Sequence, residues 1–276
     1  MRFDTVGGGL QREMRSSGGT RGVGTLPFVG REAELRLLRG YLAEARAGNG
    51  AFVFVVGERG VGKTRVVRQV ADEARNAGFL HAAGQAYEVE AGYPYAVIAD
   101  ALTPVVQRMD PQSLAVATRG TESELAQILP SLARARPATS SVDDPDTKTR
   151  MLWHFAQFLQ RLAARQPVIL TLENLQWADP ASLELLHFVG RQIRTTNLLV
   201  ITTCVDETMA EAPALQRFTR SLLRQEGVHR LEVKPLRPPE VAQLVRETFG
   251  MGGAPVDSFA SRLYEQTRGK IGRAHV

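Results

Sequence analysis

The 276-residue chain contains one cysteine, Cys204, and this scarcity excludes a disulfide framework and a cysteine-based zinc site. No apolar run is long enough to span a bilayer, and no apolar stretch follows the first arginines, as a secretory signal would require. We therefore expect a cytoplasmic chain without a membrane partner. Because Cys204 lies in an apolar segment, we expect it to be a small buried hydrophobe on a strand.

Two common catalytic patterns are missing as well. The five histidines include no H-x-x-x-H pair, and no G-x-S-x-G stretch occurs, so metalloprotease and serine-hydrolase functions have no support. The net charge of +5 is scattered along the chain and forms no basic block, which argues against direct binding to nucleic acid.

Short apolar strands alternate with amphipathic helices along most of the sequence. This alternation predicts an α/β fold in which helices cover both faces of a parallel sheet. The predicted strands are 51–56, 79–86, 167–172, 197–205 and 229–233. The predicted helices are 31–46, 63–77, 94–108, 122–135, 148–164, one that Asp179 caps, 211–225, 238–249 and 255–268. We expect a polar loop over 136–147 and disorder in the Gly-rich residues 1–25.

The segment "GERGVGKT" fits the phosphate-binding pattern G-x-x-x-x-G-K-[ST], known as Walker A. A six-residue apolar strand precedes it and an amphipathic helix follows, as the pattern requires, whereas its glycine order does not fit a dinucleotide fingerprint. Glycines let the backbone N–H groups turn toward phosphate, Lys63 can reach the β- and γ-phosphates, and the Thr64 hydroxyl can bind Mg²⁺. The predicted nucleotide-binding residues here are Gly57, Glu58, Arg59, Gly60, Val61, Gly62, Lys63, Thr64 and Arg65.

The segment "PVILTLENLQWAD" is an apolar strand that ends in an acid. Glu173 stands at the strand tip, where its carboxylate can hold Mg²⁺ directly or through water. Asn174 occupies the next position, where a second acid often polarises the attacking water; an amide can orient water but cannot accept its proton. We expect Asp179 to cap a helix and Trp177 to pack in the core.

Several segments, taken in order, resemble the ATPase module of large LuxR-type transcriptional regulators. These proteins are signal-transduction ATPases with numerous domains, which are relatives of the AAA+ P-loop NTPases. The resemblance covers about residues 27–269 and is carried by "FVGREAEL", "GERGVGKT", "YPYAVIADAL", "LENLQWADPASLELL" and "LEVKPLRPPEVAQLV". By this resemblance Val29, Gly30 and Arg31 lie near adenine, and Pro235 marks the passage to a helical lid near the nucleotide.

The chain departs from that family's pattern at two positions. Asn174 replaces the second acid, and Val205 stands where "TTCVDE" would usually carry an arginine that could sense the terminal phosphate. Both changes remove groups that act on the γ-phosphate or on the attacking water. The groups that hold the β-phosphate are untouched, so we expect firm binding of ATP or ADP with Mg²⁺ and slow hydrolysis, with Glu173 and Asn174 as weak catalytic residues.

The resemblance implies an ATP-dependent switch module that self-assembles and reaches DNA only through a C-terminal domain outside this chain. Two alternatives stay open: an ATPase module attached to a nucleotide cyclase or protein kinase, and a stand-alone AAA+-like ATPase. The expected divisions are a disordered start (1–25), an ATPase domain (26–235) and the start of a truncated helical lid (236–269). Residues 271–276 can be encoded by ATC GGA AGA GCA CAC GTC, the start of a common sequencing adapter, so we expect 270–276 to be an artefact without function.

Overall fold

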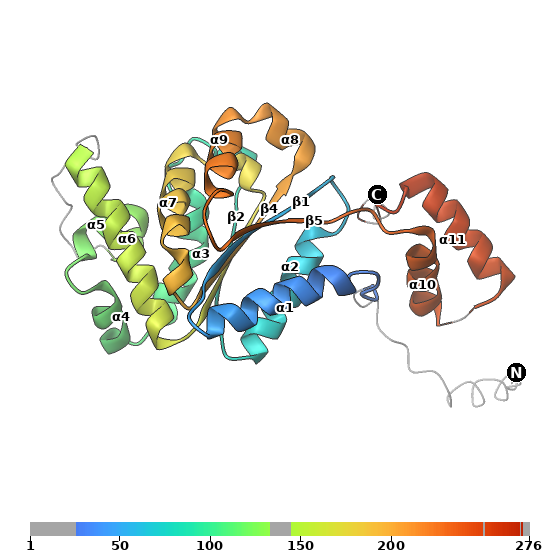
Figure 1. Ribbon diagram of the computed structural model, residues 1–276, viewed down its shortest axis with the longest axis horizontal. Helices are drawn as coiled ribbons and strands as arrows, with labels where there is room; N and C mark the ends of the chain where they lie inside the picture. The colour runs from blue at the N-terminus through green and yellow to red at the C-terminus, as the bar shows by residue number, and fades with distance from the viewer. Residues whose placement is uncertain (1–25, 133–144, 251, 271, 273–276) are drawn as a thin grey trace, which may run out of the picture.

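The computed structural model describes residues 26–132, 145–250, 252–270 and 272 (Figure 1). Its strands are β1 (Ala51–Gly57), β2 (Leu80–Gln85), β3 (Val168–Glu173), β4 (Leu198–Val205) and β5 (Val228–Glu232). Its α-helices are α1 (Glu32–Arg46), α2 (Lys63–Asn76), α3 (Ala96–Arg108), α4 (Pro111–Thr118), α5 (Glu122–Ile128), α6 (Pro145–Arg165), α7 (Pro180–Arg191), α8 (Asp206–Glu211), α9 (Pro213–Leu222), α10 (Pro238–Phe249) and α11 (Ala254–Thr267). Short 3₁₀ turns are η1 (Glu88–Glu90), η2 (Pro130–Leu132), η3 (Leu175–Trp177) and η4 (Ile193–Thr195).

The strands form one five-stranded sheet in the order β2-β3-β4-β1-β5, and every neighbouring pair is parallel. The predicted parallel α/β fold is therefore confirmed. Since all strands run the same way, their carboxyl ends meet at one edge, where Gly57 pairs in register with Val205. Strands β1 and β4 are buried along their whole length because helices cover both faces of the sheet.

Side-chain alternation along β1 feeds two separate apolar layers. Phe52 and Phe54 point into the larger layer, which α3, α6, α7 and α9 cover. Val53 and Val55 point into the other layer, which α1 and α2 cover. Cys204 is fully buried in the larger layer, as the sequence predicted.

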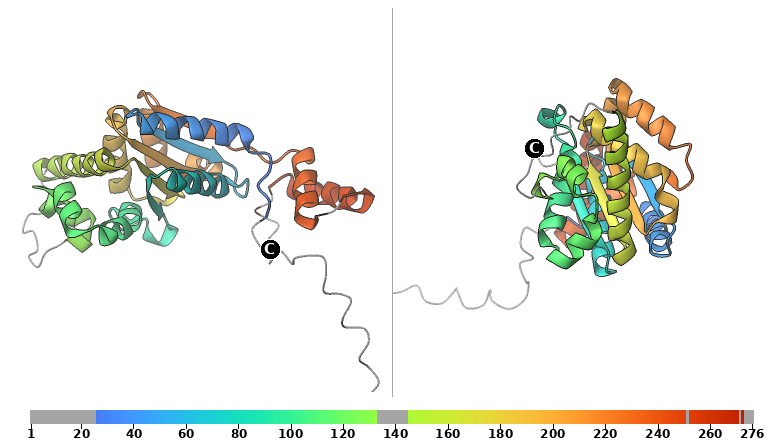
Figure 2. Two further views of the ribbon diagram at one scale, coloured as in Figure 1. Left: turned by 90° about the horizontal axis from the view of Figure 1, so that it is seen from below. Right: turned by 90° about the vertical axis from the view of Figure 1, so that its left-hand side faces the viewer.

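The helical C-terminal part, α10 and α11, lies beyond one end of the sheet, opposite to α4, α5 and α6 (Figure 1, Figure 2). A third apolar cluster joins it to the start of the described chain, where Leu236 packs with Val29, Val241 and Leu244. The backbone N–H of Leu236 also donates to the carbonyl of Gly269 at 3.1 Å. None of the described helices is long and apolar enough to cross a membrane.

The structure corrects several predicted helices. The helix predicted over 211–225 is present but shorter: α9 runs from Pro213 to Leu222, and proline suits the first position of a helix because its missing N–H has no partner there. The short helix α8 before it was not predicted. The helix predicted over 122–135 ends at Ile128, before Pro130.

The structure also adds a helix where none was predicted. Helix α4 is capped by the Asp110 carboxylate, which accepts from the N–H of Ser113 at 2.9 Å. Residues 145–147, predicted as loop, begin α6. The rest of that predicted loop and the predicted disorder over 1–25 lie outside the described residues.

Adding a methyl group at two helical glycines should change the free energy of unfolding in opposite directions. Gly40 in α1 is exposed and a Cβ there would meet nothing, so Gly40→Ala should raise the free energy of unfolding by about 0.5–1 kcal/mol. At Gly190 in α7 a Cβ would lie 2.7 Å from the buried Leu222 of α9, so Gly190→Ala should lower it by about 1–3 kcal/mol. Urea denaturation of both variants measures this; equal effects would contradict the close α7–α9 packing.

Candidate functional site

The loop between β1 and α2 has a backbone that its glycines make possible. Gly60 and Gly62 adopt φ values of 83° and 97°, in the left-handed region that costs glycine little. At Gly57, a Cβ would lie 2.4 Å from the carbonyl oxygen of Val233, so the loop leaves the sheet in contact with the chain that follows β5. The sequence therefore folds the loop tightly over the carboxyl edge of the sheet, directly before the N-terminus of α2.

Lys63 is the buried cation of the loop. Only 8% of the residue is exposed, and its Nζ donates to the carbonyl oxygens of Gly57 at 2.7 Å and Glu58 at 2.9 Å. Burial lowers the pKa of Lys63 because desolvation disfavours the ammonium form. Those two hydrogen bonds fix the ammonium at the base of the loop and leave its third N–H for a ligand.

A hydroxyl and a carboxylate meet beside the loop. The Thr64 hydroxyl donates to Glu173 Oε2 at 2.5 Å, and the Nε of Arg68 lies 3.6 Å from Glu173 Oε1. Threonine and glutamate oxygens are the ligands that Mg²⁺ prefers, and this cation usually keeps several waters or phosphate oxygens as well. The pair therefore fits Mg²⁺, although the described residues hold no cluster of three or more His, Cys, Asp or Glu side chains for an all-protein metal site.

Asn174 follows Glu173 in a special conformation. Its φ of 60° lies in the left-handed region, which asparagine tolerates better than most residues with a side chain. Its backbone N–H donates to the Thr203 hydroxyl at the end of β4, at 3.0 Å. Asn174 thus serves the turn after β3 as well as presenting an amide to the site.

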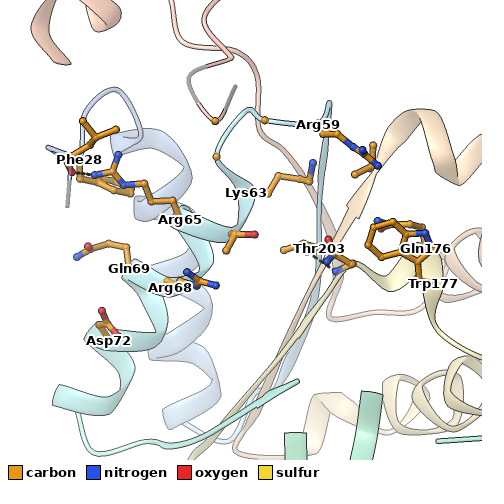
Figure 3. Close-up of a pocket in the computed structure, with 17 residues that line it drawn as sticks. Phe28, Arg59, Lys63, Arg65, Arg68, Gln69, Asp72, Gln176, Trp177 and Thr203 are labelled. Atoms are coloured by element: carbon orange, nitrogen blue, oxygen red, sulfur yellow. Dashed lines mark hydrogen bonds between the residues drawn. The ribbon is translucent and has the colours of Figure 1, made fainter. Parts of the chain in front are cut away.

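A cavity of about 970 Å³ opens over the loop and the carboxyl ends of β3 and β4 (Figure 3). Figure 3 shows Arg65, Arg68, Gln69 and Asp72 on α2 at one side, Gln176 and Trp177 at the other, and Lys63 and Thr203 between them. The lining residues are Leu26, Phe28, Arg59, Gly60, Gly62, Lys63, Thr64, Arg65, Arg68, Gln69, Asp72, Asn174, Gln176, Trp177, Thr203, Val205 and Gly272. Its charged lining is mostly basic, which suits a polyanion such as a phosphate chain.

Sequence reasoning missed part of this lining. One face of α2 carries Arg65, Arg68, Gln69 and Asp72. The phosphate-binding motif ends at the start of this helix, so counting three or four residues onward from it could have identified these side chains. Trp177 was expected to pack in the core, and it does contact the larger apolar layer while also lining the cavity. Thr203 belongs to a distant strand, so only the sheet order brings it to the site.

Some predicted residues support the loop from outside the large cavity. The guanidinium of Arg31, 6% exposed, donates to the Val61 carbonyl at 2.7 Å and to Glu34 at 3.0 Å. Val29 is buried against Leu236, and a Cβ at Gly30 would lie 2.8 Å from the Glu240 side chain. Within the part of the chain that the structure describes, Val29, Gly30, Arg31 and Pro235 do not line the cavity, so their nearness to adenine stays a prediction.

Contacts from both ends of the described chain border the same cavity. The Arg65 guanidinium lies 5.5 Å from the Phe28 ring centroid and also donates to the Leu26 carbonyl. Lys270 forms an ion pair with Glu58, and the N–H of Gly272 donates to the Gly60 carbonyl at 3.0 Å.

A family model described as "AAA ATPase domain" matches residues 27–201 of the chain. An uncharacterized protein of Rhizobium meliloti (strain 1021) is 23% identical over 248 residues, covering 83% of this chain and 24% of the relative. The chain therefore spans about a quarter of that curated relative's length.

Two solved structures match the chain to different degrees. The ORC2 protein of Aeropyrum pernix, solved as ADPNP and ADP complexes, has a TM-score of 0.50 and 14% identity, over 81% of this chain and 52% of that one. A signal transduction ATPase with numerous domains and a tetratricopeptide repeat sensor, from Pyrococcus horikoshii, has a TM-score of 0.44 and 16% identity, over 89% and 29%.

The thiol of Cys204, which lies beside the site, should be unreactive in the folded chain. Cys204 is 0% exposed, and burial raises the pKa of its thiol to about 12, so almost no reactive thiolate exists at pH 8. A thiol-specific reagent should leave the folded chain unlabelled at pH 8 and label one thiol per chain in urea. Rapid labelling of the folded chain would contradict the burial of this strand end.

Proposed function

The chain belongs to the AAA ATPase domain family, and from that premise we propose that it is the nucleotide-dependent switch of a signal-responsive transcriptional regulator. The observation that carries nucleotide binding is Lys63, an ammonium held by two loop carbonyls at the floor of a basic cavity. A switch needs firm binding of ATP and ADP more than it needs fast turnover.

The loop supplies the groups that would hold the nucleotide's phosphates. Lys63 offers its remaining N–H and its charge to the β- and γ-phosphates, and the N-terminus of α2 adds its positive dipole. Thr64 and Glu173 would hold Mg²⁺, and the cation would neutralise phosphate charge when bound.

Slow hydrolysis follows from two differences from the family pattern, at Asn174 and Val205, which both line the cavity. Asn174 offers an amide where a carboxylate would accept a proton from water, and Val205 lines the cavity without a charge. The chain keeps the groups that bind phosphate and lacks groups that speed its transfer. We propose that ATP and ADP favour different conformations, and that the ATP-bound conformation persists because hydrolysis is slow.

The part of the chain that would respond is the helical lid, residues 236–269. Leu236 packs on Val29, two residues before Arg31, and Arg31 holds the loop at Val61. A change at the loop can therefore reach α10 through a few packed side chains. In this proposal residues 26–235 bind nucleotide in the cytoplasm, the modules self-assemble, and a further domain of the longer protein contacts DNA.

Replacing Lys63 tests nucleotide binding. Lys63→Ala removes the buried ammonium, and we expect the Kd for Mg-ATP and Mg-ADP to rise by about 100-fold or more, because a hydrogen-bonded charge opposite phosphate is lost. Isothermal titration calorimetry measures both constants. Lys148→Ala is the matched control, since Lys148 pairs with Glu184 on α7, outside the cavity.

In the longer protein, the same Lys63→Ala change should abolish nucleotide-dependent transcription of a reporter. Unchanged affinity in the isolated chain would remove the basis for nucleotide binding at this loop. If Lys63→Ala lost affinity for nucleotide but left transcription of the reporter unchanged, only the proposed regulatory role would be contradicted.

Restoring an acid beside Glu173 tests the cause of slow hydrolysis. Asn174→Asp should raise the ATP turnover rate by about 10-fold or more, because a carboxylate can accept the proton of the attacking water. Aspartate also tolerates the left-handed backbone at this position, so the fold should persist. Phosphate release measures the rate, and Asn174→Ala, which adds no base, should show no gain. An equal rate in all three proteins would separate Asn174 from hydrolysis.

A further inference from the structure

One basic side chain of the cavity lining, that of Arg59, has no partner among the described residues. The basic residues of this lining are Arg59, Lys63, Arg65 and Arg68. Lys63 binds two carbonyls of the loop, Arg65 donates to a backbone carbonyl near the start of the described chain, and Arg68 forms an ion pair at the tip of β3. Arg59 is exposed, and within the described part of the chain its guanidinium makes no hydrogen bond or ion pair. Its positive charge is therefore available to a ligand.

The loop holds Arg59 close to the Lys63 ammonium. The Nζ of Lys63 donates to the carbonyl oxygen of Glu58 at 2.9 Å, and this carbonyl belongs to the peptide bond that joins Glu58 to Arg59. Standard peptide dimensions then place the Cα of Arg59 within about 6 Å of the ammonium. An arginine side chain is long enough to cover that distance, so a phosphate group bound to Lys63 lies within its reach.

The electrostatics of the loop agree with this short distance. Burial is the main cause that lowers the pKa of Lys63, and the positive charge of Arg59 acts in the same direction, whereas groups at the end of β4 and just after it oppose them. Two cations that face the same cavity repel each other, and an anion bound between them relieves that repulsion. Lys63 and Arg59 together therefore favour an anion above the loop.

Figure 3 shows which side of the cavity Arg59 occupies. Lys63 lies between Arg59 and the α2 side chains, and Arg59 shares its side with Gln176 and Trp177. Among the described lining residues, those from β4 and from the turn after β3 are all uncharged: Asn174, Gln176, Trp177, Thr203 and Val205. In the proposed function this end of the cavity faces the terminal phosphate and the attacking water. Arg59 supplies this end with a positive charge that the strands do not provide.

We propose that the Arg59 guanidinium binds the terminal phosphate and so makes the site distinguish a nucleoside triphosphate from a diphosphate. The loop backbone, Lys63 and the N-terminus of α2 can hold a diphosphate without Arg59, whereas a third phosphate adds negative charge that needs a further cation. A planar guanidinium can donate two parallel hydrogen bonds to phosphate oxygens. The inference rests on the proposed nucleotide function and adds a specificity residue to the same site.

Titration calorimetry with two nucleotides tests this role. For Arg59→Ala we expect the Kd of the Mg complex of the β,γ-imido analogue of ATP, which resists hydrolysis, to rise about 10-fold, because a charge-assisted hydrogen bond to the γ-phosphate is lost. The Kd of Mg-ADP should stay within about 2-fold, since that nucleotide has no γ-phosphate. Because Arg59 is exposed, the substitution should leave the fold intact, and unchanged ADP binding checks this.

Three further variants sharpen the result. Arg59→Glu reverses the charge and should weaken binding of the analogue more than Arg59→Ala does. Arg59→Lys keeps the charge but loses the two-pronged geometry, so its Kd for the analogue should lie between those of the wild type and Arg59→Ala. Arg36→Ala is the matched control, because Arg36 is an exposed arginine of α1 outside the cavity lining and its loss changes the net charge equally. It should change neither Kd.

The possible outcomes separate the inference from the function beneath it. An equal rise of both Kd values in Arg59→Ala would mean that Arg59 serves the loop or the whole phosphate chain, and unchanged values would mean that it binds no phosphate. Either result overturns the inference and leaves nucleotide binding in place. A wild-type chain that binds neither nucleotide, and so matches Lys63→Ala, would overturn the proposed function and this inference with it.

Discussion

The burial of the Lys63 ammonium is the constraint on which the site depends. A charged group can stay inside a protein only when polar partners replace its water, and here two carbonyls of its own loop do so. That arrangement requires the tight turn at Gly60 and Gly62, and it requires a rigid support below. The support is β1, the strand between β4 and β5, which is buried along its whole length.

The parallel sheet then decides which other groups reach the ammonium. Because β4 pairs with β1 and β3 pairs with β4, all in parallel, Glu173 and Thr203 arrive at the same edge as the loop. The Thr64–Glu173 hydrogen bond joins residues 109 positions apart, and it fixes the start of α2 over the end of β3. Arg31 secures the loop from outside by holding the Val61 carbonyl. The site is thus a meeting point of segments that are distant in the sequence.

At Asn174, which lines the cavity, the backbone conformation and the chemistry of the side chain are linked. Asn174 suits a left-handed turn that Thr203 holds, and the same residue replaces a base with an amide. In the proposed function, holding a phosphate and transferring it are served by different elements: the first by the loop and α2, the second by the turn after β3. Under that proposal, weak transfer leaves binding intact, which suits a switch.

The sequence by itself determined the local features. The order of strands and helices, the loop "GERGVGKT", the acid at the tip of β3 and the Asp179 cap all follow from short-range patterns, because backbone freedom and helix capping depend on neighbouring residues. Short-range patterns missed the short helix α8, and they placed the start of the next helix two residues before Pro213, whose ring begins α9. Only the tertiary structure decided that Thr203 holds Asn174, that Arg31 supports the loop and that Gln176 is buried without a described partner. Those facts depend on which strands pair and which faces pack, and such long-range contacts leave no fixed spacing in a single sequence.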